Sequence, residues 1–277
     1  MSAYATTLPT AVLVGGALSG VATWVIRGWS NSHGFVDLPG GRKAHARPVA
    51  LGGGIAVTLG VIVPVIAAAL AAKLLAADCP GWIPAEIAVH LDGILAKAPT
   101  ALAIVGATAV ICVLGLVDDL RPLAAWIKLL VQLAVALFLV VGCDLRLLAH
   151  LGWGPSVFLS TLWIVTLINA LNLLDNTDGL AAGVALIAAA VFGCTSMLAG
   201  QLFVPTWCCL LVGALGGFLP YNIHPASVYL GDAGSMVIGL LLAVLTILTT
   251  FADPTQGQQP IGVIAPLVVM AVPLYDT

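Results

Sequence analysis

Carboxylates stand at the ends of apolar segments in this 277-residue sequence. Only 8% of its residues are charged and 61% are hydrophobic. Five of the few acidic residues nevertheless lie where an apolar run begins or ends: Asp118, Asp119, Asp175, Asp178 and Asp232. A carboxylate beside hydrocarbon is costly unless it is paired, hydrated or bound to a cation. The pattern therefore predicts a metal-dependent active site at a membrane surface.

The adjacent pair Asp118 and Asp119 suits a cation or a basic partner, because two neighbouring carboxylates repel each other. Magnesium typically takes one or two carboxylates, keeps several waters, and uses substrate phosphates as further ligands. Lys128 and Gln132 follow four residues apart, so they share one helix face that points back toward the pair. The alternative is that the two acids simply end a helix.

A second run of polar residues repeats every three positions: Asn169, Asn172, Asp175 and Asp178. Such a stripe drifts by about 60° per step on an ideal helix, so the four side chains cannot face one point. We therefore expect the helix to break before Gly179. These amides and carboxylates could ligate a metal and hydrogen-bond a flat polar base. Interhelical polar contacts are the alternative.

The segment Gly231–Ser235 reads Gly-Asp-Ala-Gly-Ser at a predicted helix start. Free backbone N–H groups and the helix dipole favour an anion at such a position. Alternatively, Asp232 or Ser235 serves only as an N-cap. The aromatic ring of Tyr229, three residues earlier, could stack on a base.

A basic loop lies between residues 27 and 50, where Arg42, Lys43 and His45 offer donors and positive charge to phosphate oxygens. The glycines at 52–54 permit close backbone approach. Two alternatives remain open at this stage. The basic residues could anchor the chain at anionic lipid headgroups, and the glycines could form a helix-packing surface.

Long apolar segments must position these residues, since the mean hydropathy is +1.14 and spanning a bilayer takes about 20 apolar residues. We predict one all-α, polytopic membrane domain covering residues 1–277, because lipid tolerates only elements that satisfy their backbone groups internally. The first segment lacks a preceding basic residue and is expected to be retained. Nine segments are predicted: 11–26, 51–75, 99–117, 126–141, 157–171, 180–200, 202–219, 235–251 and 261–275.

Basic residues indicate the orientation, because Lys and Arg are enriched on the cytoplasmic side. Six basic residues lie in the loops after odd-numbered segments or, for Lys128, just inside the following segment: Arg27, Arg42, Lys43, Arg47, Arg121 and Lys128. The even side carries three: Lys73, Lys97 and Arg146. The N-terminus is then outside. The active-site loops 27–50, 118–125, 172–179 and 220–234 then face the cytoplasm.

Other functions fit the sequence less well. A net charge of −3 gives no basic footprint for nucleic acid. A polytopic transporter would place its carboxylates inside the spans rather than at their ends. The six cysteines follow no zinc or redox spacing, so we expect small buried hydrophobes.

Taken in order, the four motifs resemble the polyprenyl-phosphate N-acetylhexosamine-1-phosphate transferase family (glycosyltransferase family 4), over residues 34–277. The first loop and Gly231–Met236 resemble its WecA-like branch. The resemblance implies transfer of GlcNAc-1-phosphate from a UDP-sugar to undecaprenyl phosphate, with release of UMP. It also implies Mg2+, for which Mn2+ could substitute, at the cytoplasmic face of the inner membrane. Such a step starts O-antigen and related cell-surface polysaccharides.

The resemblance also implies roles for individual positions. Asp118 and Asp119 match the essential acidic pair, Lys128 a phosphate contact, and Asp232 with Asn172 the magnesium neighbours; we add Asp175 to the catalytic group. Expected substrate contacts are Arg42, Lys43, His45, Asp178, Asn222 and Tyr229. Expected partners are a UDP-N-acetylhexosamine, undecaprenyl phosphate and membrane lipids, with a homodimer left open.

One departure from the family pattern concerns the end of the chain. Family members continue past the Val-Pro-Leu-Tyr-Asp-Thr that ends this sequence, into a His-rich cytoplasmic loop and one or two more helices. We therefore expect a C-terminally truncated chain. A catalytically impaired fragment or relic of the family is the alternative function.

Overall fold

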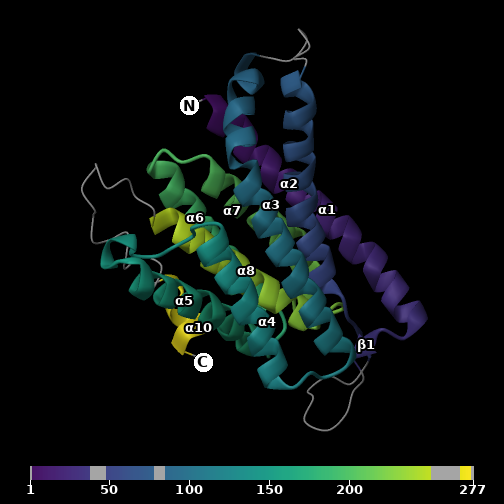
Figure 1. Ribbon diagram of the computed structural model, residues 1–277. Helices are drawn as coiled ribbons and strands as arrows, with labels where there is room; N and C mark the ends of the chain where they lie inside the picture. The colour runs from purple at the N-terminus through teal and green to yellow at the C-terminus, as the bar shows by residue number, and fades with distance from the viewer. Residues whose placement is uncertain (1, 38–47, 78–84, 251–268, 276–277) are drawn as a thin grey trace.

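The fold is a polytopic bundle of membrane-type helices (Figure 1), as predicted. A computed structural model describes residues 2–37, 48–77, 85–250 and 269–275. Within those ranges, eight helical stretches are long and apolar enough to cross a membrane. The helices are α1 Ser2–His33, α2 Gly53–Ala77, α3 Ala85–Leu120, α4 Ala125–Leu137 with its π-helical extension Phe138–Gly142, α5 Trp153–Leu174, α6 Leu180–Leu198, α7 Phe203–Asn222 and α8 Gly231–Thr250.

Shorter elements complete the described chain. Strands β1 (Val36–Asp37) and β2 (Val49–Ala50) pair antiparallel, and β2 also bridges to Val228. A 3-10 turn, Ala149–Leu151, precedes α5, and α10 spans Ala271–Tyr275.

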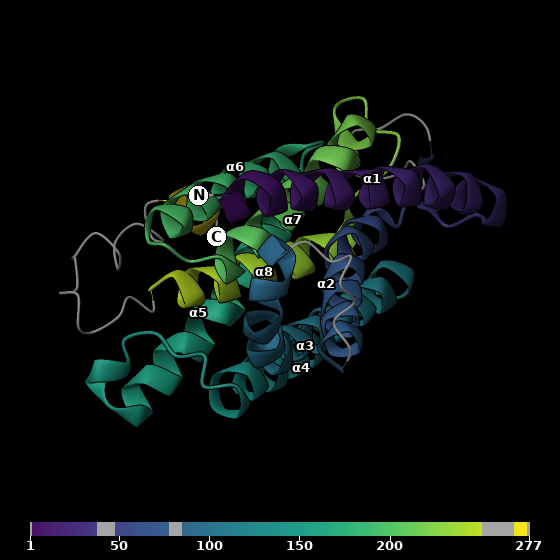
Figure 2. The ribbon, with the colours of Figure 1, turned by 90° about the horizontal axis from the view of Figure 1, so that it is seen from above.

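Helix α8 forms the centre of the bundle. It contacts α2, α3, α5, α6 and α7, and 83% of its apolar window is buried. A helix that is hydrophobic on all sides is expected to be enclosed in this way. Figure 2 shows α8 between α1 with α7 on one side and α3 with α4 on the other. Its first turn, which carries Asp232, is therefore held from several directions.

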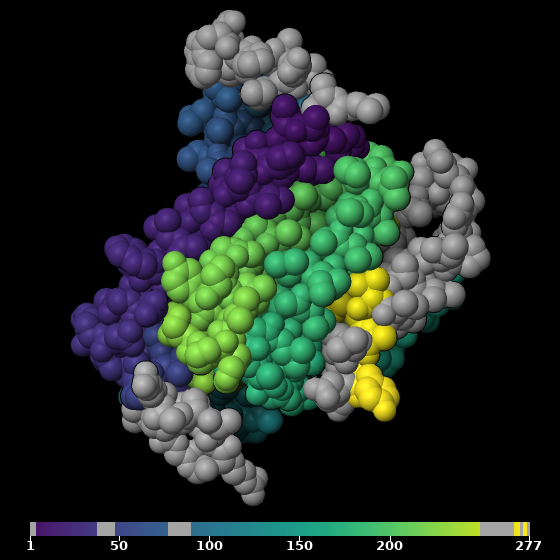
Figure 3. Space-filling model, turned by 180° about the vertical axis from the view of Figure 1, so that it is seen from behind, coloured from purple at the N-terminus to yellow at the C-terminus, as the bar shows by residue number. Residues whose placement is uncertain are grey.

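The outer helices present apolar side chains outward. Figure 3 shows α1, α7 and α6 side by side on one face of the molecule. On α1, Leu13 is 71% exposed and Trp24 is 67% exposed. Lipid solvates such side chains as well as a protein core does, so their exposure fits a membrane-spanning bundle.

Glycines allow three helices to meet at the start of α8. A Cβ atom on Gly54 of α2 would lie 2.2 Å from the backbone nitrogen of Gly234, and one on Gly115 of α3 would lie 2.4 Å from Ala233. The N–H groups of Gly53 and Gly54 donate to the carbonyls of Tyr229 and Leu230, at 3.0 and 2.9 Å. The packing interpretation of the glycines at 52–54 is therefore the one that the structure shows.

The Gly54→Ala substitution should push α2 away from α8, because the added methyl group meets backbone that cannot rotate aside. We expect a loss of about 2 kcal/mol or more in the free energy of unfolding. Gly183→Ala is the matched control, since nothing lies within 4 Å of a Cβ at that position; it should be neutral or stabilising by up to about 1 kcal/mol. Thermal unfolding in detergent measures both, and equal effects would contradict the close-packing argument.

Two of the predicted segments are much shorter than the helices that contain them. Helices α1 and α3 begin well before the apolar windows 11–26 and 99–117. A helix keeps its internal hydrogen bonds after it leaves hydrocarbon, and the 36 residues of α3 reach roughly 54 Å against a core of about 30 Å. The ninth segment, 261–275, lies mostly outside the described residues. The orientation stays a prediction.

Candidate active site

The polar motifs meet at one end of the bundle. Successive long helices run in opposite directions, so the ends of α3, α5 and α7 lie beside the starts of α4, α6 and α8 (Figure 1, near β1). The acidic pair, the three-residue repeat and the Gly231–Ser235 segment are thus brought together from distant parts of the sequence.

Lys128 joins two of the motifs. Its ammonium lies 2.6 Å from Asp118 Oδ2 and 3.7 Å from Asp232 Oδ2. The Asp118 side chain is only 6% exposed, and its other oxygen accepts the backbone N–H of Leu123 at 2.6 Å. A cation therefore sits between two carboxylates that would otherwise repel.

Asp119 holds the start of α8. Its two oxygens accept the backbone N–H groups of Asp232 and Ala233, at 2.8 and 3.2 Å. The prediction of free N–H groups for an anion was therefore wrong for these two, since a carboxylate of the protein already occupies them. Gly231 permits this approach: its φ is +72°, and a Cβ there would lie 2.7 Å from Asp119 Oδ2.

Neither N-cap alternative for α8 describes the structure. Asp232 lies inside the first turn, and its Oδ1 accepts the Asn172 amide at 2.9 Å. The same amide donates to Ser235 Oγ at 3.0 Å, while Ser235 donates to the carbonyl of Gly231. Asn172 and Asp232, the predicted magnesium neighbours, are thus in direct contact.

The helix break predicted before Gly179 is confirmed. Helix α5 ends at Leu174, Gly179 adopts a φ of +75°, and α6 begins at Leu180. The break turns Asp175 toward the acidic cluster. Burial raises the pKa of the Asp175 carboxyl well above its usual range, and the charges of Asp232 and Asp119 raise it further.

The raised pKa of Asp175 predicts a pH dependence of stability. From about pH 4 upward, the folded protein retains a proton that the unfolded chain has released. Folding stability then falls as pH rises through this window, because the folded state binds more protons. In EDTA, the apparent melting temperature should fall more for the wild type than for Asp175→Asn as the pH is raised above about 4. Parallel pH slopes for the two proteins would refute a titrating Asp175.

Asp178 and Asn222 tie the α5–α6 turn to the segment before α8. Asp178 Oδ2 lies 2.9 Å from His224 Nδ1 and accepts the N–H of Ala226 at 3.1 Å. Asn222 is 2% exposed, accepts the N–H of Gly179 and donates to the carbonyl of Val228. Both predicted substrate contacts therefore also hold the loops together. Their binding roles stay predictions.

Tyr229 lies on the same segment and is half-buried. Its N–H donates to the Ala50 carbonyl at 2.8 Å, which fixes the backbone beside β2. Partial burial raises the pKa of its phenol, and the charges of Asp178 and Asp37 add to the rise. The stacking role of its ring stays a prediction. Arg42, Lys43 and His45 fall outside the described residues, so their roles stay predictions.

Two amide residues of the polar motifs, which the sequence analysis gave no individual role, contact each other. Asn169 Nδ2 donates to Gln132 Oε1 at 2.7 Å, and Gln132 is 1% exposed. The sequence signal for this contact is that Gln132 lies one helical turn from Lys128 and Asn169 lies one turn from Asn172.

The residues present suit a hard divalent cation. Asp175 and Asp232 supply carboxyl groups, and Asn172 supplies an amide beside Asp232. Among the described residues, no three His, Cys, Asp or Glu side chains form a ready metal cage. Magnesium does not need one, because waters and substrate phosphates complete its shell.

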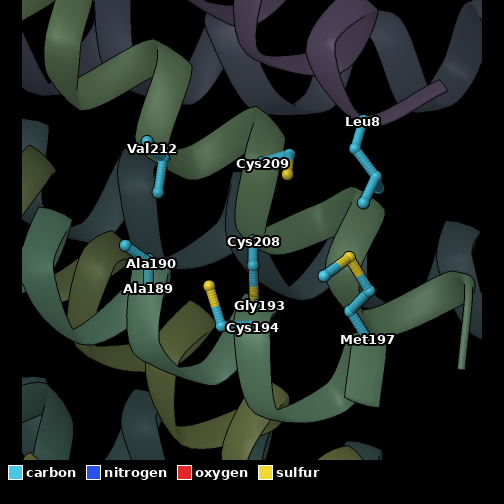
Figure 4. Close-up of a pocket in the computed structure, with 9 residues that line it drawn as sticks. All are labelled: Leu8, Ala189, Ala190, Gly193, Cys194, Met197, Cys208, Cys209 and Val212. Carbon is cyan, nitrogen blue, oxygen red and sulfur yellow. The ribbon is translucent and has the colours of Figure 1, made fainter. Parts of the chain in front are cut away.

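An apolar pocket between α1, α6 and α7 lies away from this cluster (Figure 4). Leu8, Met197 and Cys208 are among its lining residues. They come from the start of α1, the end of α6 and the start of α7, which are the helix ends opposite to the acidic cluster. The cysteines are free thiols. The pocket offers no charged group for chemistry.

Comparison with known proteins gives consistent similarities. A sequence profile described as glycosyl transferase family 4 matches residues 101–250, which carry Asp118, Lys128, Asp175 and Asp232. A Bacillus subtilis protein named probable undecaprenyl-phosphate N-acetylglucosaminyl 1-phosphate transferase is 30% identical over 88% of this chain and 62% of its own length. A Mycolicibacterium smegmatis decaprenyl-phosphate N-acetylglucosaminephosphotransferase is 32% identical over 95% of this chain and 68% of its own.

A shorter similarity extends to another type of transferase. A Staphylococcus carnosus phospho-N-acetylmuramoyl-pentapeptide-transferase is 34% identical over 49% of this chain and 49% of its own length. The chain thus spans about half to two thirds of the length of these relatives.

Proposed function

Because the chain belongs to glycosyl transferase family 4, we propose that it transfers N-acetylhexosamine-1-phosphate from a UDP-sugar to undecaprenyl phosphate and releases UMP. GlcNAc is the preferred sugar, since two of the relatives are named for N-acetylglucosamine transfer to a polyprenyl phosphate. The observation that carries the proposal is the Lys128 ammonium held between Asp118 and Asp232, beside oxygen ligands suited to Mg2+.

The site would act mainly by positioning and charge neutralisation. Lys128 would lie against the diphosphate of the donor and offset the negative charge that grows on departing UMP. Asp175, Asp232 and Asn172 would hold the magnesium ion. When bound, that ion would supply further neutralisation of phosphate oxygens.

The acceptor needs little activation. A phosphate monoester has a second pKa of about 6, so the lipid phosphate is mostly dianionic at neutral pH. An acceptor oxygen would bond to the phosphorus that carries the sugar, while the bond from that phosphorus to the UMP oxygen breaks. Asp118 and Asp119 would orient these groups, since their oxygens already accept hydrogen bonds that fix Lys128 and the start of α8.

The nucleotide would bind beside this centre. Asp178 and Tyr229 would contact the uracil, with Asn222 supporting the pocket. Arg42, Lys43 and His45 would meet phosphates from the first loop. The reaction would take place at the cytoplasmic face of the inner membrane and would start synthesis of a cell-surface polysaccharide.

The test is incubation of the detergent-solubilised protein with labelled UDP-GlcNAc, undecaprenyl phosphate and Mg2+, followed by lipid extraction. We expect lipid-soluble label that EDTA abolishes and that Mn2+ partly restores. A protein that binds UDP but yields no label with any UDP-N-acetylhexosamine would contradict the proposal.

A second measurement addresses the direct mechanism. With donor and Mg2+ but no lipid acceptor, the direct route predicts no release of UMP. A phosphosugar adduct on an aspartate, formed together with UMP, would instead establish a covalent route.

A further inference from the structure

A second polar layer lies directly beneath the catalytic one. Gln132 follows Lys128 by one turn on α4, and Met236 follows Asp232 by one turn on α8. Asn169 precedes Asn172 by one turn on α5. Since α4 and α8 begin at the site while α5 ends there, each of these three residues lies one turn deeper in the bundle than its partner.

Gln132 contacts both of the other two residues. Asn169 Nδ2 donates to Gln132 Oε1 at 2.7 Å and to the Val165 carbonyl at 2.8 Å. Gln132 Nε2 donates to Met236 Sδ at 3.8 Å. One amide pair therefore links α4, α5 and α8, the three helices that carry Lys128, Asn172 and Asp232.

Stability alone is a weak reason for this arrangement. Gln132 is 1% exposed and lies in an apolar span, and its NH2 group has a weak sulfur acceptor. A buried amide with an incomplete set of partners costs free energy, and an apolar side chain of the same size could fill the space. The Asn169–Gln132 bond constrains the rotation of α4 and α5 against each other, because a hydrogen bond is directional, and the Met236 contact relates Gln132 to α8.

We propose that Gln132 and Asn169 are positioning residues, which set the helix rotation that places the Lys128 ammonium between Asp118 and Asp232. The catalytic consequence rests on the proposed phosphoryl transfer, whereas the placement of Lys128 does not. The pair touches neither substrate nor metal in this assignment. It acts through the backbone of α4 and α5.

The test compares Gln132→Met with Thr246→Val. The first keeps the side-chain size and removes the amide. The control removes the acceptor of a 2.8 Å bond from Trp163, which joins α5 to α8 far from the site. We expect Gln132→Met to lower kcat by about 100-fold, the effect of a misplacement of about 1 Å, with KM for the donor little changed. Thr246→Val should lose similar thermal stability and keep its kcat.

A readout independent of activity is the rate at which an amine-reactive reagent acetylates Lys128, followed by peptide mass spectrometry. The rate should rise several-fold in Gln132→Met and stay at the wild-type level in Thr246→Val. An unchanged rate in Gln132→Met overturns the inference even when the wild type transfers sugar phosphate. A raised rate supports it even when the wild type transfers nothing, in which case only the proposed function fails.

Exchange of the two amides completes the test. Gln132→Asn alone should lower kcat, and adding Asn169→Gln should restore it at least in part, because the pair regains its combined length. A folded double variant that recovers neither kcat nor slow acetylation would overturn the role of the pair. Equal losses of kcat in Gln132→Met and Thr246→Val would do the same.

Discussion

Asp232→Asn should lower sugar-phosphate transfer by about 10²–10³-fold and leave the protein folded in the membrane. The carboxylate contacts Lys128 on one oxygen and Asn172 on the other. An amide of the same shape removes the negative charge that the cation and the ammonium need, and it relieves repulsion with Asp175. Transfer of label to lipid, corrected for the yield of folded protein, measures the effect.

Asp144→Asn is the matched control for this prediction. Asp144 pairs with Arg146 at 2.6 Å and its side chain is 72% exposed, at the end of the bundle away from the site. Exposed pairs of this kind contribute at most about 1 kcal/mol, so transfer should be unchanged. If Asp232→Asn lowers the yield of folded protein as much as it lowers transfer, Asp232 has a structural role and the prediction is wrong.

Lys128→Met should affect both activity and stability. Transfer should fall by at least about 100-fold, because no ammonium remains to offset phosphate charge. Asp118 would keep a nearly buried carboxylate without its cation, which should cost roughly 1–3 kcal/mol of folding stability. Activity assays and thermal unfolding in detergent measure the two losses separately.

A second substitution separates the two effects of Lys128→Met. Adding Asp118→Asn removes the unpaired charge, so stability should return toward that of the wild type while transfer stays low. A double-mutant cycle over the four proteins gives the coupling between the two side chains. Wild-type transfer by Lys128→Met would exclude the ammonium from the reaction.

Local sequence patterns predicted several features correctly. Apolar length and composition indicated the helical bundle, because a bilayer allows few other structures. The drift of Asn169, Asn172, Asp175 and Asp178 around a helix required the break that the structure has before Gly179. These predictions depend only on helix geometry and on the hydrophobicity of each segment. Both can be read from residues that are neighbours in the sequence.

The role of Asp119 was beyond the reach of such patterns. Its carboxylate caps α8 at Asp232 and Ala233, more than a hundred positions along the chain. In the sequence, the helix start at Gly231 looks open to an external anion. Only the packing of α3 against α8 shows that the anion is already part of the protein.

The amino-acid pattern alone therefore predicts a helical membrane bundle with its acidic motifs at helix ends. Burying a charge in hydrocarbon is unfavourable for each segment separately, so the rule can be applied to one segment at a time. Which of those acids meet depends on how the helices pack. Glycines at 54, 115 and 231 let α2, α3 and the Asp119 carboxylate come close to the start of α8, where Asp232 lies 3.7 Å from the Lys128 ammonium. Contacts of this kind depend on how distant helices pack, and no local spacing contains that information.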